Sequence, residues 1–219
     1  LNEVNLAMSP GERLAIVGPS GSGKSTILRL LAGLLLPSKG SLQISGIEQN
    51  YLRLDQNEPP DVRLVFQNPA LLASLTVREN VGFLLDKQKA FSETIIHEKV
   101  LNCLQKVGLY DVAEKFPNQL SGGMQKRVSF ARALISASKK GKESIPLLLY
   151  DEPTAGLDPI ACTRIEDLII KTTDAAKGCS IVVSHVSSTI ERTAQRVILL
   201  YDGKFKWDGS IDQFKQSEN

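Results

Sequence analysis

The chain has 219 residues, and 42% of them are hydrophobic, which is enough to bury one sizeable core. Its 26 basic side chains nearly balance 24 acidic ones, and the net charge of +2 gives no argument for a nucleic-acid groove or a strongly anionic partner. Three widely spaced cysteines without a C-x-x-C pair exclude a disulfide framework or a zinc site, and they favour a reducing compartment. The densest apolar run, Leu30 to Leu36, is far shorter than the roughly 18 residues that a membrane-spanning helix needs.

Short β-branched and leucine-rich runs alternate along the chain with longer stretches of helical apolar spacing. The predicted strands are Arg13–Val17, Val62–Phe66, Leu147–Tyr150, Ser180–Ser184 and Val197–Tyr201. The predicted helices are Ser25–Leu35, Thr94–Val107, Met124–Ala137 and Ile160–Lys171. This alternation indicates an α/β fold.

We expect a single domain with a core at about residues 1–67 and 135–219 and an inserted helical subdomain at about residues 68–134. The insertion is predicted because the sequence from Asn68 to Leu134 is mostly helical in spacing and shows no clear strand. The Asp202-Gly203 pair between two apolar runs predicts a hairpin. The basic stretch Ser136–Ser144 is expected to be a solvated loop, with a docking patch as the less favoured alternative.

The first apolar strand leads directly into a phosphate-binding loop of the pattern G-x-x-x-x-G-K-[ST]. Its residues are Gly18, Pro19, Ser20, Gly21, Ser22, Gly23, Lys24 and Ser25, followed by Thr26. Glycines let backbone N–H groups turn toward phosphate oxygens, and the positive end of the next helix faces the same anion. Lys24 would reach the β- and γ-phosphates and Ser25 would bind Mg²⁺. The sequence therefore predicts a nucleotide site, and an unliganded glycine-rich turn is the disfavoured alternative.

A later apolar strand, Leu147–Tyr150, ends in two adjacent carboxylates, Asp151 and Glu152. Asp151 is predicted to hold Mg²⁺ through water, and Glu152, which points elsewhere, to act as the general base for an attacking water. Such a pair alone is most often a solvated strand end. Together with the phosphate loop, it favours nucleotide hydrolysis.

A phosphate loop with a carboxylate is also found in kinases and GTPases, so the Leu120-Ser121-Gly122-Gly123 sequence at the start of a helix discriminates between these classes. Ser121 can cap that helix, and Gly122 and Gly123 allow close approach to an anion. The sequence resembles the signature motif of ABC transporter ATPases. The resemblance implies that Ser121, Gly122 and Gly123 contact the γ-phosphate held by a second subunit, so that two chains enclose two ATP molecules.

Three further motifs resemble the same family in the same order along the chain. Gln67 looks like the Q-loop glutamine, which helps position Mg²⁺ and water; Ala155–Asp158 looks like the D-loop, with Asp158 at the nucleotide; and His185 looks like the switch histidine that contacts the γ-phosphate. Outside the family context, His185 would be read as a packing residue. Only 17 residues precede Gly18, so we expect the aromatic residue that stacks on adenine in family members to lie outside this sequence.

The cargo is inferred from a narrower likeness. The run Leu157–Cys162 with Glu166–Ile169, the run Leu75–Asn80 and the run Ser187–Ile190 are similar to Mla-type phospholipid transporters and plastid trigalactosyldiacylglycerol-type relatives. The resemblance implies a homodimer, a separate membrane permease, a lipid-binding substrate protein and no nucleic acid. It implies a peripheral membrane protein, at the cytoplasmic face of a bacterial inner membrane or the stromal face of a plastid inner envelope. The alternatives are another ABC importer or exporter, a soluble non-transport ABC ATPase, and a small-molecule kinase.

Overall fold

The computed structural model describes all residues except 58, 89–90, 136–144, 177 and 218–219. The predicted solvated loop, Ser136–Ser144, lies outside the described residues. The strands are β1 (Arg13–Val17), β2 (Gln43–Ile44), β3 (Ile47–Glu48), β4 (Val62–Val65), β5 (Leu147–Asp151), β6 (Cys179–Val183), β7 (Arg196–Tyr201) and β8 (Lys204–Ser210). The helices are α1 (Lys24–Leu31), α2 (Val77–Gln88), α3 (Glu93–Lys106), α4 (Gly122–Leu134), α5 (Pro159–Ala176), α6 (Ser187–Thr193) and α7 (Ile211–Ser217), with single turns of 3-10 helix at Arg53–Asp55 and Pro117–Gln119.

The main sheet has the strand order β4-β5-β6-β1-β7-β8. The first five of these strands run parallel, and β8 returns antiparallel to β7 through the predicted Asp202-Gly203 hairpin. The α/β fold class and the five predicted strands are confirmed, with bounds that differ by at most one residue. A small antiparallel ribbon, β2 and β3, was not predicted because each strand is only two residues long.

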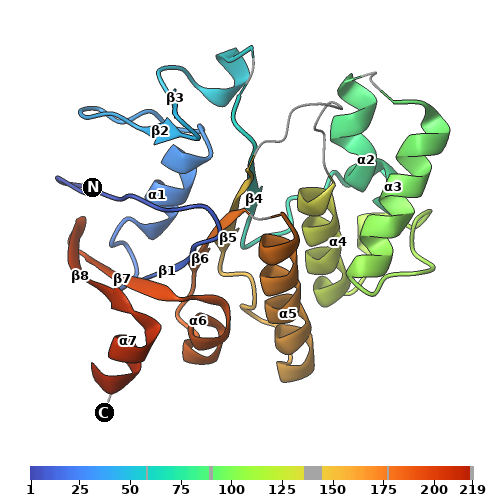
Figure 1. The fold of residues 1–219 in the computed structure, drawn as a ribbon. Helices are drawn as coiled ribbons and strands as arrows, with labels where there is room; N and C mark the ends of the chain where they lie inside the picture. The colour runs from blue at the N-terminus through green and yellow to red at the C-terminus, as the bar shows by residue number, and fades with distance from the viewer. Residues whose placement is uncertain (58, 89–90, 136–144, 177, 218–219) are drawn as a thin grey trace.

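Alternation along the strands places two apolar faces on opposite sides of the sheet. Leu14 and Ile16 of β1 pack with α1, whereas Ala15 and Val17 pack with α6. Figure 1 shows α1 on one side of the sheet, α4, α5 and α6 on the other, and α2 and α3 beyond α4. Both faces of the parallel strands are therefore covered, as buried parallel sheets require.

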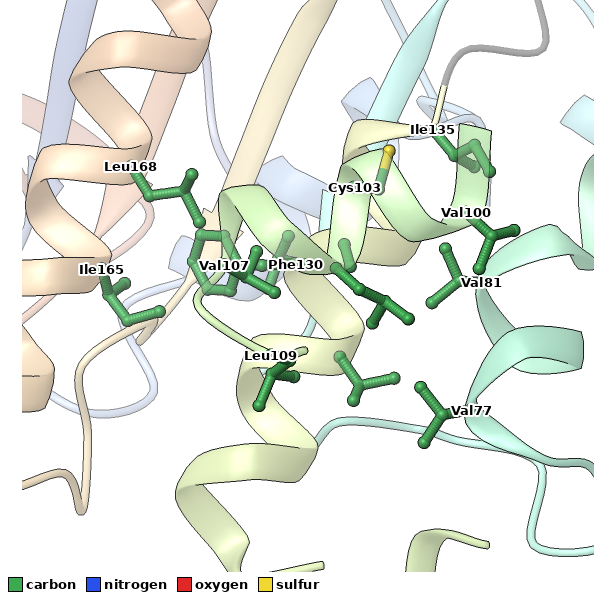
Figure 2. Packing of buried hydrophobic residues seen from close by; sticks show 14 of the residues in the cluster. Val77, Val81, Val100, Cys103, Val107, Leu109, Phe130, Ile135, Ile165 and Leu168 are labelled. Carbon is green, nitrogen blue, oxygen red and sulfur yellow. The ribbon is translucent and has the colours of Figure 1, made fainter. Parts of the chain in front are cut away.

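One continuous apolar cluster joins the helices beyond the sheet to the sheet itself. Figure 2 shows side chains of α2, α3, α4 and α5 meeting in this cluster. Phe130 of α4 stacks on Tyr150 of β5, with ring centroids 5.4 Å apart, and both side chains are fully buried. Because Tyr150 immediately precedes Asp151, this stacking holds α4 against the strand end that carries the two acidic residues.

The predicted helix Ser25–Leu35 is wrong at its C-terminal end, where α1 stops at Leu31. Gly33 adopts a left-handed conformation with φ +69°, and the N–H of Leu34 donates to the carbonyl of Arg29. The N–H of Gly33 donates to the carbonyl of Leu30, which completes a Schellman motif. The leucines beyond this point continue the helical spacing of the sequence without continuing the helix.

Among the described residues, no helix is both long enough and apolar enough to cross a bilayer.

Candidate functional site

The carboxyl ends of four parallel strands open into one pocket of about 430 Å³. Its lining residues come from the last residues of β5 and β6, from the loops after β1, β4, β5 and β6, and from the first turn of α1. They are Gly18, Ser20, Gly21, Gly23, Lys24, Ser25, Thr26, Gln67, Asp151, Glu152, Val183 and His185. This is the edge at which open parallel sheets bind their ligands, and it brings together predicted residues that are up to 167 positions apart, from Gly18 to His185.

The loop after β1 requires glycine where it passes β7. A Cβ atom on Gly18 would lie 2.0 Å from the carbonyl oxygen of Leu200, which leaves no room for any other residue. Gly21 and Gly23 adopt φ angles of +78° and +108°, which L side chains rarely reach. The loop therefore wraps backbone around the mouth of the pocket, and α1 starts at its end with no acidic residue in the first turn.

Two polar side chains of the loop, Lys24 and Ser22, have hydrogen-bonding capacity that the fold uses only within the loop or not at all. The ammonium of Lys24 donates to the carbonyl oxygens of Gly18 and Pro19 at 2.7 and 2.8 Å, which folds this cation back over its own loop. The hydroxyl oxygen of Ser22 is buried without a hydrogen-bond partner. A buried polar atom normally has a hydrogen-bond partner. The unpaired hydroxyl of Ser22 is therefore consistent with a loop whose hydrogen bonds are completed when an anion binds.

Asp151, the last residue of β5, faces α1 and the phosphate loop. Burial raises the pKa of its carboxyl group, and a hydrogen bond from Ser25 partly opposes this rise. The nearby carboxyl of Glu152 raises the pKa further, while Arg29 and Lys24 lower it. A hydroxyl and a half-buried carboxylate side by side form the oxygen donor pair that Mg²⁺ prefers when other ligands come from a nucleotide.

Glu152 has an unusual backbone conformation for a residue with a side chain, with φ +47°. Its N–H donates to the carbonyl of Val183 in β6 at 2.9 Å, and its carbonyl accepts from Ala155 at 3.2 Å. Left-handed conformations of this kind collect at functional sites, where the surrounding structure holds them. The turn separates the carboxyl group of Glu152 from that of Asp151, although the two residues are adjacent.

The carboxyl group of Glu152 contacts His185 across the pocket. His185 Nδ1 lies 2.9 Å from Glu152 Oε1, and the histidine side chain is 70% exposed whereas that of Glu152 is 11% exposed. The second oxygen, Oε2, is buried without a partner. The carboxyl group therefore keeps one acceptor for a further group, such as a water molecule, while the histidine fixes the other. Gln67 is exposed on the loop after β4 and lines the same pocket.

Ser121, Gly122 and Gly123 are placed elsewhere, at the N-terminal end of α4. The hydroxyl of Ser121 accepts a hydrogen bond from the N–H of Met124 at 3.3 Å and caps the helix. Ser121 and Gly122 are exposed, and a Cβ atom on Gly122 would meet nothing within 4 Å. None of these three residues belongs to the set that lines the pocket, so the N-terminal end of α4 is not part of the phosphate-loop site of its own chain.

Asp158 is also outside the pocket lining, and it caps α5. Its Oδ1 accepts from the N–H groups of Ile160 and Ala161 at 3.0 Å each. Sequence reasoning missed a neighbouring contact, in which the ammonium of Lys126 on α4 donates to the carbonyl of Ala155. This bond ties the Ala155–Asp158 loop to the helix that carries Ser121. No local pattern marks it, because the partners are 29 residues apart.

Comparisons with known proteins place this site in a wider context. A family model described as "ABC transporter" matches residues 1–155. The chain is 46% identical to the protein TRIGALACTOSYLDIACYLGLYCEROL 3, chloroplastic, of Arabidopsis thaliana, over all of the chain and 66% of that protein's length. It is 34% identical to the intermembrane phospholipid transport system ATP-binding protein MlaF of Haemophilus influenzae, over all of the chain and 81% of that protein.

Among solved structures, the fold is similar to that of a dimeric ATP-binding cassette in a post-hydrolysis state, bound to ADP and Pi. The TM-score is 0.82 and the sequence identity is 33%, over 95% of this chain and 89% of the other.

Proposed function

We propose that this chain, which belongs to the ABC transporter family as one of its ATP-hydrolysing subunits, works as a homodimer and powers the transport of a lipid through a separate membrane permease. One observation carries the proposal. The pocket gathers the phosphate loop, Asp151, Glu152 and His185, while Ser121, Gly122 and Gly123 of the same chain do not line it. The contribution expected of these three residues to an ATP site would therefore come from a second copy.

ATP is proposed to bind with its phosphates in the loop from Gly18 to Thr26. Lys24 would exchange its two carbonyl partners for the β- and γ-phosphate oxygens, which are better acceptors for an ammonium group. Ser25 and Asp151 would hold Mg²⁺, with Gln67 as a further oxygen ligand at the pocket edge. Mg²⁺ would neutralise charge on the phosphates.

Hydrolysis is proposed to depend on the pair Glu152 and His185. Glu152 would take a proton from the attacking water, because its second oxygen has no partner in the protein. His185 would hold the first oxygen in place and present its exposed ring to the γ-phosphate. Gln67 would help to orient the water. Catalysis would then consist mainly of positioning and electrostatic stabilisation, as is general for phosphoryl transfer.

The second copy is proposed to present the N-terminal end of its α4 to the γ-phosphate. This end is exposed, has no acidic residue in its first turn, and carries two glycines on which an added Cβ atom would meet nothing closer than 3.5 Å. Such a helix start binds anions through free N–H groups and its positive dipole. The dimeric cassette bound to ADP and Pi, at a TM-score of 0.82, supports this arrangement. Asp158 would lie near the same interface.

Ser121→Arg is therefore expected to leave ATP binding by the isolated chain within about twofold of the parent, because Ser121 does not line the phosphate-loop pocket. Hydrolysis should fall to the background rate, since the bulky cation would occupy the place of the partner's γ-phosphate. Binding is measured by calorimetry and hydrolysis by phosphate release. The matched control is Ser92→Arg, which replaces the capping serine of α3 and should keep the parental rate. Full hydrolysis by Ser121→Arg would contradict the shared site.

The proposed cargo is a lipid, because the likeness to the two lipid-named relatives extends over the whole chain. We also propose that residues 68–134 act as a helical subdomain that transmits closure of the dimer to the permease, since α2, α3 and α4 contact one another and share one apolar cluster. The chain would then be peripheral to a membrane, at the cytoplasmic face of a bacterial inner membrane or the stromal face of a plastid envelope. A lipid-binding substrate protein would complete the transporter.

Purification of the tagged native chain from solubilised membranes is expected to recover a permease with several membrane spans. In the purified complex, the ATPase rate should respond to added phospholipid or galactolipid. It should not respond to thiamine or sulfate, which are named as the cargo of other similar import ATP-binding proteins. A Lys24→Ala complex provides the control, since it should retain the permease but show no lipid-dependent hydrolysis. Recovery of the chain with soluble partners alone would favour the non-transport ATPase. A response to thiamine or sulfate would agree with a role in transport but would contradict a lipid as the cargo.

A further inference from the structure

A buried polar network lies behind the pocket, between α5, α6 and the loop after β5. Its members Glu166, Thr189 and Thr154 are each no more than 2% exposed. The hydroxyl of Thr189 donates to Glu166 Oε1 at 2.8 Å, and the hydroxyl oxygens of Thr154 and Thr189 are 2.9 Å apart. Arg192 Nε lies 2.9 Å from Glu166 Oε2. None of these four residues lines the pocket.

The hydrogen bonds of this network have only one consistent direction. A carboxylate accepts and cannot donate, so the single hydroxyl proton of Thr189 is used on Glu166. Thr154 must therefore donate to Thr189. The chain of hydrogen bonds runs from Thr154 through Thr189 to Glu166 Oε1, and Arg192 pairs with the other carboxylate oxygen, Oε2. A buried carboxylate is costly unless it is paired and hydrogen-bonded, and removal of Thr189 takes one hydrogen bond from Glu166 and the threonine partner from Thr154.

The network joins the two segments that carry the reacting pair. Thr154 follows Glu152 by two residues, and Thr189 follows His185 by four. Glu152 and His185 contact each other directly at 2.9 Å, and the two threonines join the same segments at a second point. The backbone bond from Glu152 to Val183 joins the two strand ends, and the threonine pair adds a side-chain restraint on the far side of both reacting residues. The unusual backbone of Glu152, at φ +47°, makes this restraint important.

We propose that Glu166 is a positioning residue for ATP hydrolysis, which acts through Thr189 and Thr154 to fix the carboxyl group of Glu152 against His185. The proposal rests on the roles assigned to Glu152 and His185 under the proposed function. Because the network does not touch the phosphate loop, its loss should lower kcat and leave the KM for ATP nearly unchanged.

Thr189→Val tests the network with little change in side-chain volume. We expect kcat to fall by about ten- to hundredfold, the range that a small misplacement of a catalytic group produces, with KM within about twofold of the parent. Glu166→Gln should behave similarly, because its single amide oxygen cannot accept from both Thr189 and Arg192. Thr189→Ser, which keeps the hydroxyl, should restore most of the rate. The matched control is Asp167→Asn, which removes the charge from an exposed partner of Arg192, 2.7 Å away, and should leave kcat unchanged.

A purely structural role is separated from positioning by repeating the substitution in a Glu152→Gln chain under single-turnover conditions. Positioning predicts no further loss of rate when Thr189→Val is added, because the group to be positioned is already absent. A further loss of the same size as in the parent would overturn the proposal. The proposal would also be overturned if Thr189→Val had the parental kcat while Glu152→Gln was inactive. Parental hydrolysis by Glu152→Gln would instead remove the proposed role of Glu152 itself, and the inference with it.

Discussion

Lys24→Ala is expected to weaken ATP binding by about a hundredfold or more, which corresponds to ~2.7 kcal/mol. Lys24 is the basic side chain that the phosphate loop directs to the pocket, where it contacts the carbonyl oxygens of Gly18 and Pro19. Its removal leaves the β- and γ-phosphates without their ammonium partner. Isothermal titration calorimetry with ATP and Mg²⁺ measures the dissociation constant.

The matched control for this substitution is Lys39→Ala, which removes the same charge from an exposed position. It should leave ATP affinity within about twofold of the parent, because exposed charges are screened by solvent and salt. The thermal midpoint of Lys24→Ala should stay close to that of the parent, since the two carbonyl groups that lose their partner lie where water reaches them. An unchanged dissociation constant in Lys24→Ala would exclude the phosphate-loop site.

Glu152→Gln is expected to lower the rate of ATP hydrolysis by about 10² to 10⁴ while ATP still binds. The amide keeps the shape of the side chain and a hydrogen bond to His185, but it cannot accept a proton from water. Phosphate release under saturating ATP measures the rate. Asp151→Asn provides the contrast, because it should weaken the dependence on Mg²⁺ and the binding of the metal-nucleotide complex.

A Glu152→Gln chain that hydrolyses ATP at the parental rate would remove the general-base assignment. Equal effects of Glu152→Gln and Asp151→Asn on Mg²⁺ dependence would show that the two adjacent carboxyl groups share one role, in binding the metal. The structure argues against that outcome, because the left-handed turn at Glu152 directs one carboxyl to His185 and leaves the other beside Ser25.

The strands were predictable from sequence because each is a short apolar run that is buried on both faces. The end of α1 was not, since Leu34 and Leu35 continue the helical spacing while Gly33 ends the helix. A Schellman motif depends on the backbone of one glycine, and the apolar pattern of its neighbours conceals it. The helices α6 and α7 were missed because seven residues carry too little periodicity to detect.

The polar members of the pocket were predictable because each belongs to a short contiguous motif at the end of a strand, whereas Val183, the last residue of β6, was not predicted as a site residue. What the sequence could not supply was the pairing of atoms across the pocket, such as Glu152 with His185, 33 positions apart. The link from Thr154 through Thr189 to Glu166 is of the same kind, since it spans 35 and 23 residues. These contacts depend on the strand order of the sheet, which places β6 beside β5. No local pattern encodes that order.

The shared ATP site is tested most directly by the molar mass of Glu152→Gln in Mg²⁺ and ATP, measured by light scattering during size exclusion. We predict a species of twice the 23.9 kDa of one chain, with two ATP molecules bound, which returns to one chain when Ser121→Arg is added. With ADP, the same protein should run as one chain. A Glu152→Gln chain that binds ATP with high affinity and still runs at the mass of one chain would contradict a site built from two copies.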